Sequence, residues 1–119
     1  MTNLSPLIER LAAATEPDRE LDLAIAIAVF GRPGRLVVQY DEDTGRTCEY
    51  THWEYTGSID AAMTLIPKPW TMIDLHQSAD GELWHAAVRI PGLEVGTDEA
   101  CPSPAIAICI AALKARAAR

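Results

Sequence analysis

One segment of the sequence, Leu21–Phe30, is apolar on nearly every side and constrains the fold more than any other. If this segment is a helix, it has to be covered on more than one face, because its apolar side chains point in all directions. Glu16-Pro17 is typical of the start of such a helix, and Gly31 followed by Pro33 is typical of its end. We therefore expect a helix that occupies the centre of the core.

Three further helices are predicted from their start signals. Ser5-Pro6 and Ser103-Pro104 each place a serine hydroxyl where it can cap the first turn and a proline at the first helical position. Ser58 is expected to cap a short helix that Pro67 ends, because proline cannot continue a helix. The apolar residues expected on one face of this short helix are Ile59, Ala62, Met63 and Ile66.

Two β-hairpins are predicted from strand-like segments on either side of turns. The first pairs Leu36–Tyr40 with Arg46–Thr51, and the second pairs Trp70–Gln77 with Glu82–Ile90. Strict alternation in the second hairpin puts Trp70, Met72, Asp74 and His76 on one face of its first strand, with Thr71, Ile73 and Leu75 on the other. In its return strand, Trp84, Ala86, Val88 and Ile90 share a face. A polar, acidic loop is expected from Gly92 to Pro102.

The predicted order of elements is helix, helix, hairpin, helix, hairpin, helix. Hairpins that are segregated from the helices favour an α+β fold over regular βα alternation. We therefore expect residues 1–119 to form a single-domain layered α/β/α sandwich. Its mostly antiparallel sheet, built from the two hairpins, would be covered by about four helices.

The balance of charged and apolar residues excludes several classes of function. A formal net charge of -7 repels phosphate backbones, so we do not expect sequence-independent nucleic-acid binding. The longest nearly apolar run, Leu21–Phe30, is about half of the roughly 20 residues that a helix needs to cross a bilayer, so we expect no membrane span. Three cysteines without a secretory leader indicate a reducing cytoplasm.

No residue pattern predicts a catalytic centre, a metal site or a cofactor. Cys48 and His52 are the only close Cys/His pair, and on one strand they would lie about 13 Å apart, too far to share a zinc ion. None of the usual nucleophile motifs is present. The acidic clusters Asp41–Asp43 and Asp98-Glu99 fall in loops where carboxylates stay solvated.

The segment Gly31–Arg35 carries the most specific binding signal. Its glycines let the backbone approach a ligand, and Arg32 and Arg35 can grip a phosphate or carboxylate; the alternative is a helix stop with solubilising charge. Trp53 and Tyr55 can stack on a flat ligand, and the alternative is that both cover the sheet as core residues.

Four segments of the chain resemble the phage ABA-sandwich domain family: Leu21–Ala26, Tyr55–Ala62, Trp84–Ala86 and Ser103–Leu113. The resemblance rests mainly on the Tyr-Thr segment before an alanine-rich turn and on the terminal Pro-Ala-Ile helix, and it covers nearly the whole chain. It implies a small phage or prophage protein with α/β/α layers that acts in the cytoplasm of the infected host cell. It implies no established reaction and no catalytic residues.

These observations favour a non-enzymatic phage or prophage accessory protein that acts by binding a host or phage partner protein. An alternative is sequestration of a small anionic ligand, such as a nucleotide immune signal, by Arg32, Arg35, Trp53 and Tyr55. A small hydrolase is a third alternative. The apolar helix and the loop from Gly92 to Pro102 are compatible with a homo-oligomer as well as with a monomer.

Overall fold

Four helices and five strands follow one another along the part of the chain that the structure describes. The structure is a computed structural model, and it describes residues 4–31, 36–41, 43–51, 54–79, 81–98 and 100–118. The helices are α1 (Ser5–Ala13), α2 (Arg19–Phe30), α3 (Ile59–Met63) and α4 (Pro104–Ala117). The strands are β1 (Leu36–Asp41), β2 (Arg46–Thr51), β3 (Thr71–Gln77), β4 (Trp84–Ile90) and β5 (Leu93–Gly96). The α+β class predicted from the sequence is therefore confirmed.

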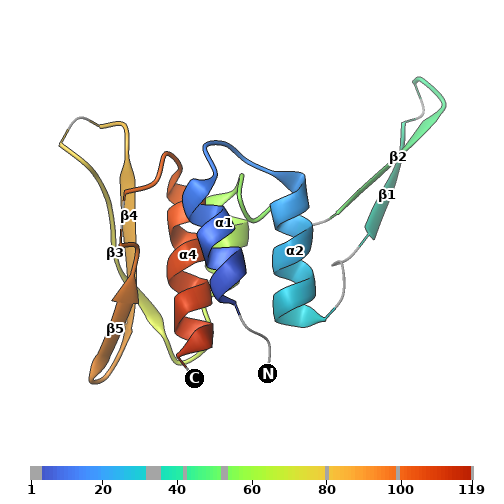
Figure 1. Cartoon of the computed structure of the whole chain (residues 1–119). Helices are drawn as coiled ribbons and strands as arrows, with labels where there is room; N and C mark the ends of the chain where they lie inside the picture. The colour runs from blue at the N-terminus through green and yellow to red at the C-terminus, as the bar shows by residue number, and fades with distance from the viewer. Residues whose placement is uncertain are drawn as a thin grey trace.

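Helix α4 forms the centre of the core. Every residue from Ala105 to Leu113 is buried, and so is Ala115. The helix contacts β4 and β5 of the sheet as well as α1 and α3 (Figure 1). Five of its buried residues are alanines, and their small side chains let neighbouring elements pack closely on several sides.

The prediction that α2 occupies the centre of the core is wrong. The buried side of α2 consists of Leu21, Asp22, Ile25 and Ala26. Its opposite side leaves Leu23, Ile27 and Phe30 between 39% and 50% exposed. Both helices are rich in apolar residues and both contain alanines, so the difference lies in their neighbours. Helix α4 packs against β4, β5, α1 and α3, whereas α2 packs mainly against α1 and covers the core from outside.

Most helix ends lie where the capping residues predict them. The hydroxyl groups of Ser58 and Ser103 accept hydrogen bonds from the first turns of α3 and α4, and Gly31 ends α2 with a φ of 75°. Helix α1 differs from the prediction, because its N-cap residue is Leu4 instead of Ser5, and the side chain of Leu4 cannot cap it. Helix α2 begins later than Glu16-Pro17 suggests, because the carboxylate of Asp18 caps it.

The short helix α3 buries only part of the predicted face: Ala62 is buried and Ile66 packs against the core, but Ile59 and Met63 do not. Ile59 and Met63 are 43% and 40% exposed, whereas Ala61 and Ala62 are buried. Helix α3 packs against α4, and its two alanines allow the close approach that the larger side chains would prevent.

Strands β3, β4 and β5 form an antiparallel sheet in that order. Ala86 and Val88 of β4 are buried on the side that packs against α4, as the predicted alternation requires. Strand β5 lies inside the segment predicted to be a loop. Its short sequence carries little strand signal, and its pairing with β4 depends on the tight turn at Gly92, whose φ is 83°.

The two predicted hairpins are both present, but they form separate sheets instead of one. Figure 1 shows the β1–β2 hairpin extending beyond α2, on the side of the helices away from the β3–β4–β5 sheet. The helices therefore cover one face of the three-stranded sheet (Figure 1), where the sequence suggested helices on both. The physical reason is that α2 and α4 separate the first hairpin from the second.

Candidate functional site

The face of the β3–β4–β5 sheet that points away from α4 carries a depression of about 460 Å³, here called the outer groove. Six polar residues line it: Asp74, His76, His85, Glu94, Thr97 and Asp98. The remaining lining comes from Ala86, Ala87, Val95 and Gly96. These residues lie far apart in the sequence and come together through strand pairing.

A β-bulge in β3 brings the acidic and imidazole side chains to this face. Met72 pairs with Val88, but Asp74 pairs with Ala87, so Ile73 is an extra residue in the ladder. This shift turns Met72 towards the core, while Asp74 and His76 join the outward face of β4. The predicted alternation, with Met72 and Asp74 on one face, is therefore wrong.

The two histidines of the outer groove stack on each other across β3 and β4. Their ring centroids lie 5.2 Å apart, with an angle of 23° between the planes. His76 Nδ1 lies 2.7 Å from a carboxylate oxygen of Asp74, and His85 Nδ1 lies 3.2 Å from the hydroxyl oxygen of Thr97. Each imidazole thus has one nitrogen oriented by a neighbouring side chain.

A lysine from the central helix fixes the rim of the outer groove. Lys114 Nζ donates hydrogen bonds to the carbonyl oxygen of Gly96 and to the carboxylate of Asp98, both at 2.8 Å. The bonded ammonium group holds the pKa of Asp98 below its ordinary value. The rim of the groove is therefore tied to α4, the most buried element of the fold.

The chemistry available in the outer groove is that of ion pairing and hydrogen bonding. The side chains of Asp74 and His76 are about half exposed, so water has free access to the pair. None of the described lining residues is a serine or cysteine, and the lining's one hydroxyl group, that of Thr97, is the group that contacts His85 Nδ1. Within the described residues, no group of three or more His, Cys, Asp or Glu side chains is arranged to hold a metal ion.

Of the four residues predicted to bind a ligand, the structure describes only Tyr55. Its side chain is 1% exposed and belongs to the core, and its carbonyl oxygen accepts a hydrogen bond from Cys109 Sγ at 3.2 Å. Burial raises the pKa of the Tyr55 hydroxyl. Arg32, Arg35 and Trp53 lie outside the described residues.

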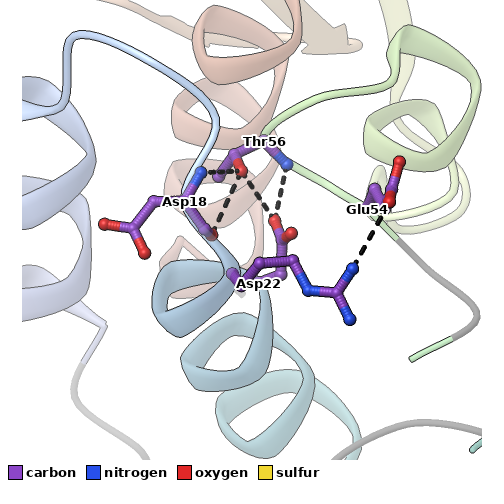
Figure 2. Close-up of polar contacts among 5 residues, drawn as sticks. Asp18, Asp22, Glu54 and Thr56 are labelled. Atoms are coloured by element: carbon purple, nitrogen blue, oxygen red, sulfur yellow. Dashed lines mark hydrogen bonds and ion pairs between the residues drawn. The ribbon is translucent and has the colours of Figure 1, made fainter. Parts of the chain in front are cut away.

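A second polar cluster, which the sequence does not predict, joins α2 to the segment before α3 (Figure 2). Asp22 and Thr56 are 3% and 0% exposed, and a carboxylate oxygen of Asp22 accepts hydrogen bonds from Thr56 N and Thr56 Oγ1, both at 2.8 Å. Thr56 Oγ1 also accepts a bond from Asp18 N at 2.8 Å. Arg19 and Glu54 form an exposed ion pair beside it. Because Asp22 and Thr56 are enclosed, we assign this cluster to structure and not to ligand binding.

The fold and the outer groove define a small α+β protein in which one face of the three-stranded sheet is covered by none of the described helices and carries acidic and imidazole side chains. Comparisons with family models, with curated proteins and with solved structures found no match to this chain. No helix in the described part of the chain combines the length and the apolar character that crossing a membrane requires.

Proposed function

We propose that this protein is a non-enzymatic binding protein whose outer groove accepts a basic segment of a partner protein. The observation that carries the proposal is the groove of about 460 Å³ on a sheet face that no described helix covers. A concave surface with a few polar groups is the ordinary form of a binding site. Its open shape suits a segment of a protein chain better than a small molecule enclosed on all sides.

The charge of the groove favours a basic segment. Asp74, Glu94 and Asp98 contribute three carboxylates to the lining, and none of the described lining residues is a lysine or an arginine. Lys114 offsets the charge of Asp98. At the margin of the groove, Arg89 lies opposite Glu94 in the register of β4 and β5. The two remaining sources of positive charge, His76 and His85, are charged only when protonated. The whole chain carries a net charge of -7, which attracts a basic partner from a distance.

The proposal includes an origin in a phage or prophage, with a host or phage protein as the partner and the host cytoplasm as the place of action. The resemblance to the phage ABA-sandwich domain family is the support for this part of the proposal. Sequestration of a small anion stays a prediction from the sequence, since Arg32, Arg35 and Trp53 lie outside the described residues. Unchanged nucleotide binding in an Arg32→Ala, Arg35→Ala variant, measured by calorimetry, would contradict it.

The proposal is tested by titrating the protein with an arginine- and lysine-rich peptide and measuring affinity by calorimetry. Exposed charge pairs contribute about 0.2–1 kcal/mol each, so Asp74→Asn with Glu94→Gln should weaken binding roughly fivefold. The matched control removes two exposed carboxylates outside the groove lining, by Glu16→Gln with Asp60→Asn, and should leave the affinity within about twofold of the wild type. Equal losses in the two double variants would mean that the peptide responds only to net charge.

A further inference from the structure

Helix α2 carries a row of large apolar side chains that face away from the core. Leu23, Ile27 and Phe30 are 39%, 50% and 48% exposed. Spacings of four and three residues place them on one face of the helix, over two turns. We call this row the α2 stripe. Three large, half-exposed apolar side chains in a continuous row are typical of a contact surface.

The two ends of the α2 stripe carry opposite charges. Glu20 is exposed and lies one turn before Leu23, at the amino end of the helix. At the other end, the guanidinium group of Arg116 lies 5.8 Å from the centroid of the Phe30 ring. Arg116 is held there by a hydrogen bond from its Nε to the carbonyl oxygen of Leu65, at 2.7 Å. The stripe therefore has an acidic end and a basic end.

We infer that the α2 stripe binds a second copy of this chain, with the two α2 helices packed side by side and antiparallel. In a two-fold symmetric interface the same surface of both copies meets in opposite directions. Because the α2 stripe has opposite charges at its two ends, the acidic end of one copy then faces the basic end of the other. In this arrangement Ile27 lies at the two-fold axis, Leu23 meets Phe30 of the second copy, and Glu20 approaches Arg116 of the second copy. The antiparallel helix dipoles also attract each other.

This surface is independent of the outer groove. The groove belongs to the sheet on one side of α4, whereas α2 lies on the other side of α4 (Figure 1). The apolar contact is short, so the dimer should be reversible and depend on protein concentration. If the basic peptide failed to bind in the groove, the dimer proposal would be unaffected. If the dimer failed to form, the proposal for the groove would be unaffected.

Sedimentation equilibrium tests whether the dimer forms. We expect the mass to rise with concentration from 12.9 kDa towards twice that value. Ile27→Glu should keep the protein monomeric, because it places two carboxylates at the symmetry axis. Leu93→Glu is the matched control, since Leu93 is 42% exposed on β5, and it should leave the dimer intact. A wild-type chain that stays monomeric at its highest soluble concentration, or a dimer that Ile27→Glu does not weaken, would overturn the proposal.

Disulfide trapping tests the antiparallel orientation. The thiol groups of Cys101 and Cys109 are buried, and replacing Cys48 with serine removes the third cysteine of the chain. In that background, a mixture of Leu23→Cys and Phe30→Cys chains should form mainly mixed disulfides under mild oxidation. Pairs of identical chains as the main product would indicate parallel helices and overturn the proposed arrangement. Leu93→Cys chains serve as the control and should remain reduced.

Discussion

At the scale of single residues, the buried pair Asp22 and Thr56 links two elements that are distant in the sequence (Figure 2). Asp22→Ala would leave the buried Thr56 N–H without an acceptor, and such an unsatisfied group costs about 1–3 kcal/mol. Asp22→Asn should cost clearly less, because the amide oxygen can still accept both bonds from Thr56. Urea unfolding measures the two free energies, and equal losses would show that the hydrogen bonds contribute nothing.

The same carboxyl group should make stability depend on pH. Burial raises the pKa of Asp22 above its ordinary value of 3.8, even though Thr56 lowers it through hydrogen bonds. The folded state therefore binds the proton more tightly than the unfolded state, so the free energy of unfolding should fall as pH rises from 3.8 through the raised pKa. Asp22→Asn should remove this decrease. An unchanged slope above pH 3.8 in urea titrations of the variant would contradict the assignment.

Asp98 should change the free energy of unfolding with pH in the opposite direction from Asp22 and in a different pH range. Lys114 lowers the pKa of Asp98 below its ordinary value of 3.8. The stability that the Lys114–Asp98 pair provides is therefore present above pH 3.8 and is lost as the pH falls through the lowered pKa. The effect of Asp98 therefore lies below pH 3.8 and that of Asp22 above it. A pH series on the wild type and on Asp22→Asn separates the two groups.

At the scale of elements, the outer groove depends on the close pairing of β4 with β5. A Cβ atom on Gly96 would lie 2.6 Å from the carbonyl oxygen of Ala86. Gly96→Ala should therefore push β5 away from β4 and destabilise the fold by about 1–3 kcal/mol, the usual cost of overpacking. Glu94→Ala, at an exposed site in the same strand, should change stability by less than about 0.5 kcal/mol. Thermal unfolding compares the stabilities of the two variants. A Gly96→Ala protein as stable as the Glu94→Ala protein would contradict the predicted cost of a Cβ atom at Gly96.

Elements with strong local signals could be predicted from the sequence. The capping residues Ser58, Ser103 and Gly31 define helix ends through bonds within one turn, and both hairpins follow from turns between strands. The bulge at Ile73 could not be predicted, because a residue inserted in the ladder leaves no local trace in a strand sequence. The exchange of roles between α2 and α4 also escaped prediction, since both helices are apolar and only their neighbours decide which one is enclosed.

At the scale of the whole molecule, α4 separates two surfaces that have different chemistry. The acidic outer groove lies on the sheet side, and the apolar α2 stripe lies beyond the helices on the other side (Figure 1). A dimer through α2 would point its two grooves away from each other and could bind two partner segments at once. The groove itself could not be predicted from the sequence, because residues 74–98 meet there only through the bulge and the unpredicted strand β5.

Nuclear magnetic resonance can show directly whether the basic peptide binds in the outer groove. Backbone amide shifts of the isotope-labelled protein would be followed during titration with the basic peptide. We predict that the largest shifts fall on His85, Ala87 and Gly96, and that Asp74→Asn with Glu94→Gln makes them smaller at the same sub-saturating peptide concentration. Shifts centred on α2, or spread evenly over the acidic surface, would contradict the assignment of the groove as the binding site.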